Sequence, residues 1–244
     1  MKRLWATLRN DVRLQWRNGF YYAAAVILAL FFLLLAQLPP ADLQWLLPVV
    51  IVNNLVVNGF YFVAGLVLLE KGEGILQAQV ITPLRPLDYL ASKVFSLALL
   101  SLLENGLLLL LLLGATVSAG WLLLGILAGT AFFTLAGFLA VVRYEALNEY
   151  LLPSLLMVAV LTLPLLTYFG VGDAAIFSSL VYLHPLQAVL LALRAATGAT
   201  LQAWQTVYIL LYTGAFMLVA LRLAQAAYER FVRRATLSSA RGQA

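Results

Sequence analysis

The sequence predicts an all-α integral membrane protein, and three observations lead to that fold class. Of its 244 residues, 64% are hydrophobic and only 10% are charged, with a mean hydropathy of +0.98. An ordinary soluble domain is roughly half apolar and about a quarter charged. Six stretches approach or exceed the roughly 18 to 20 apolar residues that cross a hydrocarbon core. These stretches lack the alternation of a membrane barrel strand, so they are expected to be helices.

The first segment, residues 1–19, is predicted to be an amphipathic helix lying in the plane of the lipid headgroups. One face carries apolar side chains and arginines lie beside it; the apolar residues are Leu4, Trp5, Leu8, Val12 and Trp16. Such a helix is either an anchor or a transmitter of motion from a cytosolic partner. The apolar stretch that follows is too long for a secretory signal, so we interpret it as a retained first span.

A single domain over residues 20–223 is predicted to hold six transmembrane helices. Their expected bounds are Phe20–Leu38, Trp45–Leu69, Tyr89–Leu113, Trp121–Val142, Leu151–Phe169 and Trp204–Leu221. Five glycines are expected to allow close helix approach, namely Gly59, Gly65, Gly106, Gly129 and Gly137. Pro153 and Pro164 are expected to bend the fifth span.

The basic residues predict the orientation in the membrane. Fourteen of the fifteen lysines and arginines fall in the N-terminal segment, the second and fourth loops with the start of the third span, and the C-terminal end, where Arg222 precedes the tail over 224–244. Short loops rich in lysine and arginine mark the cytoplasmic side. We therefore expect a multi-pass protein of a bacterial cytoplasmic membrane, with both termini and the basic tail in the cytoplasm.

Residues 170–203 are predicted to form one or two short helices that are external or re-entrant. A competing seventh span over Ile176–Leu193 would be interrupted by Pro185. It would also move the arginines of the tail to the outside, against the orientation rule.

The loop over residues 70–88 is the most informative part of the chain. Glycines at 72 and 74 favour a break after the second span, and Thr82-Pro83 with Arg85-Pro86 ends a short helical turn. This loop is similar to the cytoplasmic coupling helix of type-2 ATP-binding-cassette (ABC) permeases, which contacts the ATPase subunit. The residues that match are Glu70, Glu73, Gly74, Leu76, Thr82, Pro83, Leu84, Tyr89 and Lys93. The ATPase contacts that the resemblance implies are Glu70, Glu73, Ile75, Leu76, Gln77, Val80, Thr82, Pro83, Leu84 and Arg85.

A second resemblance to the same family precedes the last span, in His184-Pro185-Leu186, Leu193-Arg194 and Gly198. Within the family, Asn148-Glu149 leading into Leu152-Pro153 is similar to small bacterial drug-export permeases of the fluoroquinolone-efflux kind. The chain departs from the family pattern at Gln77, where glutamate is common, and at His184, where asparagine is common.

The resemblance implies the membrane-spanning subunit of an ATP-driven exporter of an amphipathic or apolar compound such as a drug, peptide or lipid. Its expected partners are two ABC ATPase subunits, a second permease subunit and membrane lipid. The sequence contains no phosphate-binding loop, so ATP and magnesium are expected on the ATPase and no cofactor or metal on this chain. Catalytic residues and nucleic-acid binding are not expected either, because a lone histidine and scattered arginines support neither.

Four polar residues inside the predicted spans are candidates to line a transport pathway: Asn53, Asn54, Asn58 and Glu104. Asn54 and Asn58 lie one helical turn apart and share a face. A charge at the depth of Glu104 needs a partner, a cavity or a proton. Hydrogen bonds between helices would explain all four equally well. An alternative function is therefore an ion- or proton-coupled secondary transporter that uses Glu104.

Overall fold

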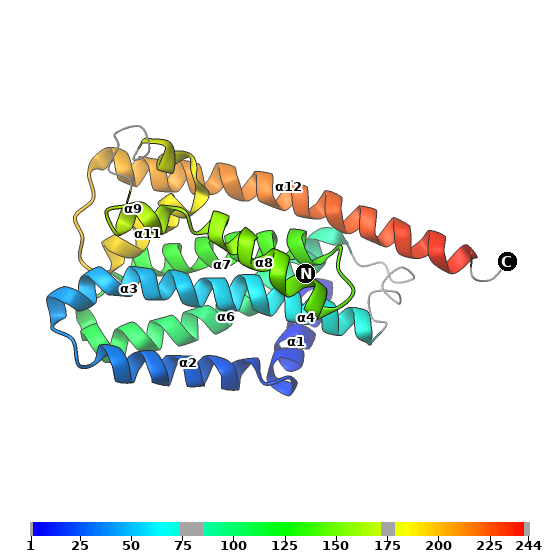
Figure 1. The fold of residues 1–244 in the computed structure, drawn as a ribbon, viewed down its shortest axis with the longest axis horizontal. Coiled ribbons are helices and arrows are strands. Elements are labelled where there is room, and N and C mark those ends of the chain that lie inside the picture. The colour runs from blue at the N-terminus through cyan, green and yellow to red at the C-terminus, as the bar shows by residue number, and fades with distance from the viewer. Residues whose placement is uncertain (1, 74–84, 172–178, 242–244) are drawn as a thin grey trace.

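The chain is all-helical wherever the structure describes it. The computed structural model describes residues 2–73, 85–171 and 179–241, and no strand occurs among them. This confirms the predicted fold class. The long helices lie side by side, with α1 crossing them at one end (Figure 1). The elements are α1 (Lys2–Arg17), α2 (Phe20–Leu35), α3 (Pro40–Leu55), η1 (Val56–Tyr61), α4 (Phe62–Gly72), α6 (Pro86–Leu113), η2 (Gly114–Thr116), α7 (Ala119–Val141), α8 (Leu147–Leu161), α9 (Pro164–Tyr168), η3 (Val181–Leu183), α11 (Pro185–Ala196) and α12 (Ala203–Arg241).

Four helical stretches in the described part of the chain are long and apolar enough to cross a membrane: Pro40–Gly72, Pro86–Leu113, Ala119–Val141 and Ala203–Phe231. A fifth is the pair α1 and α2, which is bent by 63°. The bend falls at Gly19, whose φ of 80° is a left-handed conformation that glycine adopts without strain.

The predicted fifth span is shorter than the others. Its main helix α8 has 15 residues, and it ends before Pro164, which opens α9. At 1.5 Å per residue α8 is about 22 Å long, less than a hydrocarbon core of about 30 Å. The six-span count therefore stays a prediction, although α8 and α9 together run along the same bundle (Figure 1).

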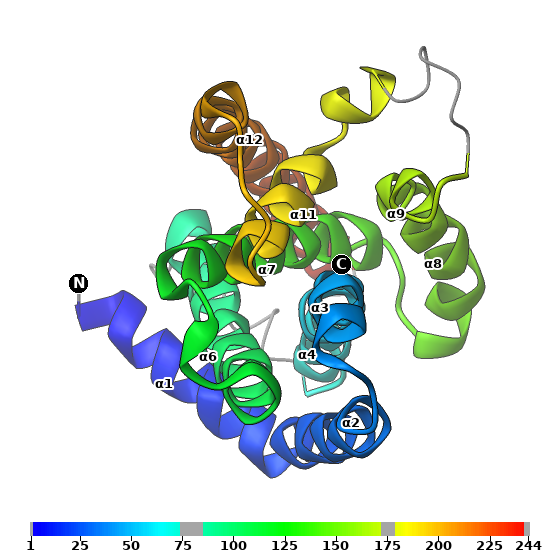
Figure 2. The same ribbon diagram turned by 90° about the vertical axis from the view of Figure 1, so that its left-hand side faces the viewer.

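Helix α7 lies in the middle of the bundle, with α3, α6, α11 and α12 around it (Figure 2). Small residues allow this packing. A Cβ on Gly137 would lie 2.6 Å from the Phe60 carbonyl oxygen, and one on Gly59 would lie 2.7 Å from Phe133 Cβ. The close approach predicted at these glycines and at Gly129 is confirmed. At Gly106 the prediction is wrong, because a Cβ added there would meet no atom of another described helix within 4 Å.

The segment before the last span folds back onto the bundle. Helix α11 has 12 residues, most of them buried, and packs against α7, α12 and α3. His184 precedes it, and its Nδ1 accepts a hydrogen bond from the Leu186 N–H at 3.2 Å. Burial lowers the pKa of His184, which favours the neutral ring that can accept this bond. Whether the segment is external stays a prediction.

Candidate functional site

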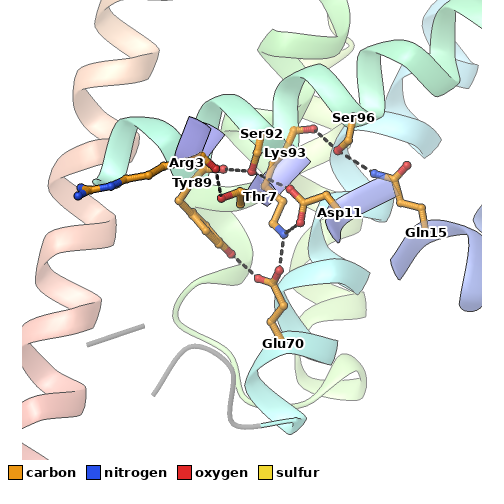
Figure 3. Close-up of polar contacts among 9 residues, drawn as sticks. All are labelled: Arg3, Thr7, Asp11, Gln15, Glu70, Tyr89, Ser92, Lys93 and Ser96. Carbon is orange, nitrogen blue, oxygen red and sulfur yellow. Dashed lines mark hydrogen bonds and ion pairs between the residues drawn. The ribbon is translucent and has the colours of Figure 1, made fainter. Parts of the chain in front are cut away.

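Three helices meet beside the predicted coupling loop: the end of α4, the start of α6 and the middle of α1 (Figure 3). At their junction the Lys93 ammonium lies 2.6 Å from Asp11 Oδ1 and also donates to Glu70 Oε1. The side chains of Lys93 and Asp11 are 1% exposed and that of Glu70 is 3% exposed. One buried cation therefore joins carboxylates from two other helices.

Neutral partners complete this junction. The Tyr89 hydroxyl donates to Glu70 Oε2 at 2.7 Å, and the Ser92 hydroxyl donates to Asp11 Oδ2 at the same distance. We call Asp11, Glu70, Tyr89, Ser92 and Lys93 the stem cluster. It joins the two stems of the coupling loop, which are the end of α4 before the loop and the start of α6 after it. Every carboxylate oxygen of the cluster has a partner, which is what lets charges stay buried.

The stem cluster also explains how α1 packs. Its inward face is polar: Asp11 reaches Lys93, and Gln15 Nε2 donates to Ser96 Oγ at 2.8 Å. Trp5 and Trp16 of the predicted apolar face are 70% and 59% exposed. Indole rings on the outer side of α1 are typical of the membrane interface. The sequence analysis did not single out Asp11, whose only signal is a lone carboxylate among the arginines of this helix.

A second contact holds the end of α4 against α7. The Lys71 ammonium donates to the backbone oxygens of Val142 and Tyr144 at 3.0 and 2.6 Å, and lies 3.4 Å from Glu145 Oε1. It also lies 4.8 Å from the centre of the Phe231 ring on α12. A cation at the carbonyl end of a helix is favoured by the helix dipole. Lys71 thus links the end of α4 to the C-terminal end of α7 and to α12.

The predicted ATPase contacts divide into three groups. Glu73 and Arg85 are exposed, and Glu73 pairs with Arg17 at 2.7 Å. Glu70 is buried in the stem cluster, which speaks against a direct contact with a partner; its assignment stays a prediction. The rest lie outside the described residues, namely Ile75, Leu76, Gln77, Val80, Thr82, Pro83 and Leu84.

The candidate pathway residues fall on two sides of the second span. Asn54 and Asn58 are fully buried, whereas Asn53 is exposed. Asn54 Nδ2 donates to Asn105 Oδ1 at 2.9 Å, and Asn58 Nδ2 donates to Glu104 Oε2. We call Asn54, Asn58, Glu104 and Asn105 the amide cluster. These hydrogen bonds join the second span to α6, which agrees with the interpretation that these residues hold two helices together. A role in lining the pathway stays a prediction.

The amide cluster does not use all of its hydrogen-bonding capacity. Within the cluster, Asn54 Oδ1, Asn58 Oδ1 and Glu104 Oε1 have no partner in the described structure. The same is true of three hydroxyl groups on α6 and α7, those of Ser101, Thr130 and Thr134. Beside them the second span changes from an α-helix to the π-helix η1. Single π-turns inside helices are frequent at functional sites.

Comparison with known proteins identifies the family. A sequence profile of the Fluoroquinolones export permease protein family matches residues 2–236. Curated proteins from two strains of Mycobacterium tuberculosis, each called a fluoroquinolones export permease protein, are 31% identical to this chain over 234 residues. The alignment covers 95% of this chain and 97% of each relative.

The chain belongs to this family. The family resemblance drawn from the sequence is thereby confirmed, and the chain is a multi-pass membrane protein of the permease class. The family match begins in α1 and extends into α12, so it includes both the stem cluster and the amide cluster. Among the described residues, no group of three or more histidine, aspartate or glutamate side chains is placed to hold a metal ion.

Proposed function

We propose that the chain is the membrane-spanning subunit of an ATP-driven exporter, with ATP and magnesium bound by a separate ABC ATPase. Two copies of this chain, or this chain and a related permease, would pair in the membrane and receive two ATPase subunits. The exported compound is an amphipathic or apolar drug. Relatives named for fluoroquinolone export support a planar aromatic compound of that kind.

The observation that carries this proposal is the stem cluster. Its residues come from α4, which precedes the coupling loop, from α6, which follows the loop, and from α1. Removing one partner of a buried ion pair costs about 3 to 5 kcal/mol, so these three helices move as one unit. A force applied to the loop by an ATPase would therefore reach the second and third spans together.

The loop and both termini are proposed to lie in the cytoplasm of a bacterial cell. The distribution of lysine and arginine supports this orientation, because almost all of them gather at the loop stems and termini. The end of α1 with Arg17, the end of α4 with Lys71 and the start of α6 after Arg85 belong to this group. Helix α11, which carries Arg194, lies towards the opposite end of the bundle from α1 and α4 (Figure 1).

The test is co-purification of the tagged chain with its ATPase, together with fluoroquinolone efflux from cells. The Leu76→Asp variant is expected to lose both the ATPase and the efflux, because a buried carboxylate would oppose docking of the loop. The matched control is Leu87→Asp, which introduces the same charge at an exposed leucine in the first turn of α6 that is not among the predicted ATPase contacts. It is expected to keep the ATPase.

Two results would contradict the proposal. One is a Leu76→Asp chain that retains its ATPase and its efflux. The other is efflux that stops when a protonophore collapses the proton gradient while cellular ATP is held constant. The second result would favour a proton-coupled transporter that uses Glu104.

A further inference from the structure

A cavity of about 670 Å³ opens between the end of α7 and the C-terminal half of α12. Six of the eight residues that line it are apolar, and the other two are arginines. The lining residues are Leu139, Val142, Arg143, Leu223, Ala226, Ala227, Arg230 and Phe231. A wall of this composition fits a molecule with an anionic head and an apolar tail.

The two arginines lack a counter-charge in the described part of the chain. Neither Arg143 nor Arg230 forms an ion pair there. Glu145, close in sequence to Arg143, is held by Lys71. Glu229 neighbours Arg230 but does not line the cavity, as expected for side chains about 100° apart on a helix. The sequence from 232 to 244 contains no aspartate or glutamate.

The depth of the cavity places it where hydrocarbon meets headgroups. Along α12 the predicted span ends at Leu221 and charged residues begin at Arg222, and the Lys71 ammonium beside the Phe231 ring lies at the end of α4 that leads into the coupling loop. From the cavity towards the middle of the span, the same face of α12 presents the exposed side chains of Leu223 and Val219. The apolar wall is therefore continuous with a helix face that lipid tails can cover.

We propose that this cavity binds an anionic glycerophospholipid, with its phosphate between Arg143 and Arg230 and an acyl chain along α12. Guanidinium groups match phosphate oxygens in a bidentate geometry and are more weakly hydrated than ammonium groups. Lipid in this position would join α12 to the end of α7, next to the Lys71 contact. None of the residues that line the cavity is among the predicted ATPase contacts or the candidate pathway residues, so the proposal stands whether or not the proposed function is correct.

The test uses the full-length chain purified without any ATPase, in detergent, with phosphatidylglycerol or phosphatidylcholine added. Native mass spectrometry measures the bound lipid, and a thermal melt measures its stabilising effect. Phosphatidylglycerol is expected to bind and to raise the melting temperature, and phosphatidylcholine is expected to do neither. Arg143→Gln and Arg230→Gln are each expected to weaken phosphatidylglycerol binding about fivefold, and the double variant roughly 25-fold.

Two control variants separate this site from general charge attraction. Arg9→Gln and Arg222→Gln remove exposed arginines that do not line the cavity, and they are expected to keep the full affinity. Ala227→Phe fills the cavity without changing the charge, and it is expected to lose the bound lipid while folding normally without it.

Three results would overturn the proposal. The double variant could retain as much phosphatidylglycerol as the unchanged chain. Inorganic phosphate could raise the melting temperature as much as phosphatidylglycerol, which would indicate a simple anion site. The double variant could instead become monomeric with unchanged lipid binding, which would indicate that a second copy covers the cavity.

Discussion

The stem cluster and the amide cluster are both buried, and both join the second span to α6, yet they are built differently. In the stem cluster one ammonium satisfies two carboxylates, and hydroxyl groups fill the remaining acceptor positions. In the amide cluster each link is a single hydrogen bond, and several oxygens remain without a partner. The carboxylate oxygens of the stem cluster are all paired, whereas the amide cluster keeps oxygens that have no hydrogen-bond partner.

The difference separates a rigid connection from one that can rearrange. A fully paired charge network in a low dielectric has no second arrangement of similar energy, because any displacement leaves a bare charge. Interhelical hydrogen bonds between amides in membranes contribute only about 0.6 kcal/mol on average. We infer that motion enters at the stem cluster as a rigid displacement and is accommodated at the amide cluster and η1.

The sharpest way to break this comparison is Lys93→Met, which leaves two buried carboxylates without their cation. We expect a loss of about 3 to 5 kcal/mol in the free energy of unfolding, measured by thermal or denaturant melts in detergent. Adding Asp11→Asn and Glu70→Gln to the same chain removes the stranded charges and is expected to restore much of the stability. If the Lys93→Met variant alone were as stable as the unchanged chain, the stem cluster would not be a rigid connection.

The second prediction concerns the backbone beside the amide cluster. A Cβ at position 59 would lie 2.7 Å from Phe133 Cβ and 3.2 Å from the Thr130 carbonyl oxygen. Gly59→Ala is therefore expected to destabilise the bundle by about 1 to 3 kcal/mol through overpacking. Gly106→Ala is the matched control, since a Cβ added there would meet no atom of another described helix within 4 Å. Equal melting temperatures for the two variants would show that the crossing of η1 and α7 can open at no cost.

The third prediction compares a carboxylate from each cluster. Glu104→Gln keeps an oxygen that can accept from Asn58, so the free energy of unfolding should change by about 1 kcal/mol or less. Glu70→Gln removes one of the two charges that compensate Lys93 and should cost more. Thermal melts of the two variants test this order. Efflux measured in parallel separates stability from transport, because a normal melt with abolished efflux in Glu104→Gln would indicate proton coupling.

The smallest expected effect is at the exposed pair of Arg17 and Glu73, 2.7 Å apart. Both side chains are in contact with solvent, so Arg17→Ala should change the free energy of unfolding by about 1 kcal/mol or less, as for other surface ion pairs. The change should shrink further at high salt. A cost as large as that of Lys93→Met would mean that the connection to the loop extends well beyond the stem cluster.

The sequence predicted the helices well because hydrophobic length decides them in a membrane protein. It predicted a bend of the fifth span at Pro164, where the structure has a break between α8 and α9, and it put Asn54 and Asn58 on one face through the helical period. The short length of α8 could not be predicted from the sequence. A membrane span is judged from the mean hydropathy over a window of residues, and here the apolar residues continue past the break between α8 and α9.

The contacts of the candidate site could not be predicted in the same way. The family resemblance pointed to Glu70 and Lys93, but as separate positions of a motif. Their pairing depends on how α4 and α6 pack, and Asp11 joins them from 82 positions away. Polar residues on a predicted interfacial helix are ordinarily assigned to solvent, so the sequence pattern of α1 gave no reason to pair Asp11 with Lys93.

The π-helix has a consequence for the way this chain tolerates insertions and deletions. Asn54 and Glu70 lie on either side of η1, sixteen residues apart, and both bond to α6. On an uninterrupted α-helix, residues at that separation would point about 160° apart. One extra residue taken up by the wider turn brings the two directions to within about 60° of each other. Deleting a single residue between 56 and 61 would therefore rotate α4 relative to α3, so that one helix could no longer present both Asn54 and Glu70 to the same neighbour.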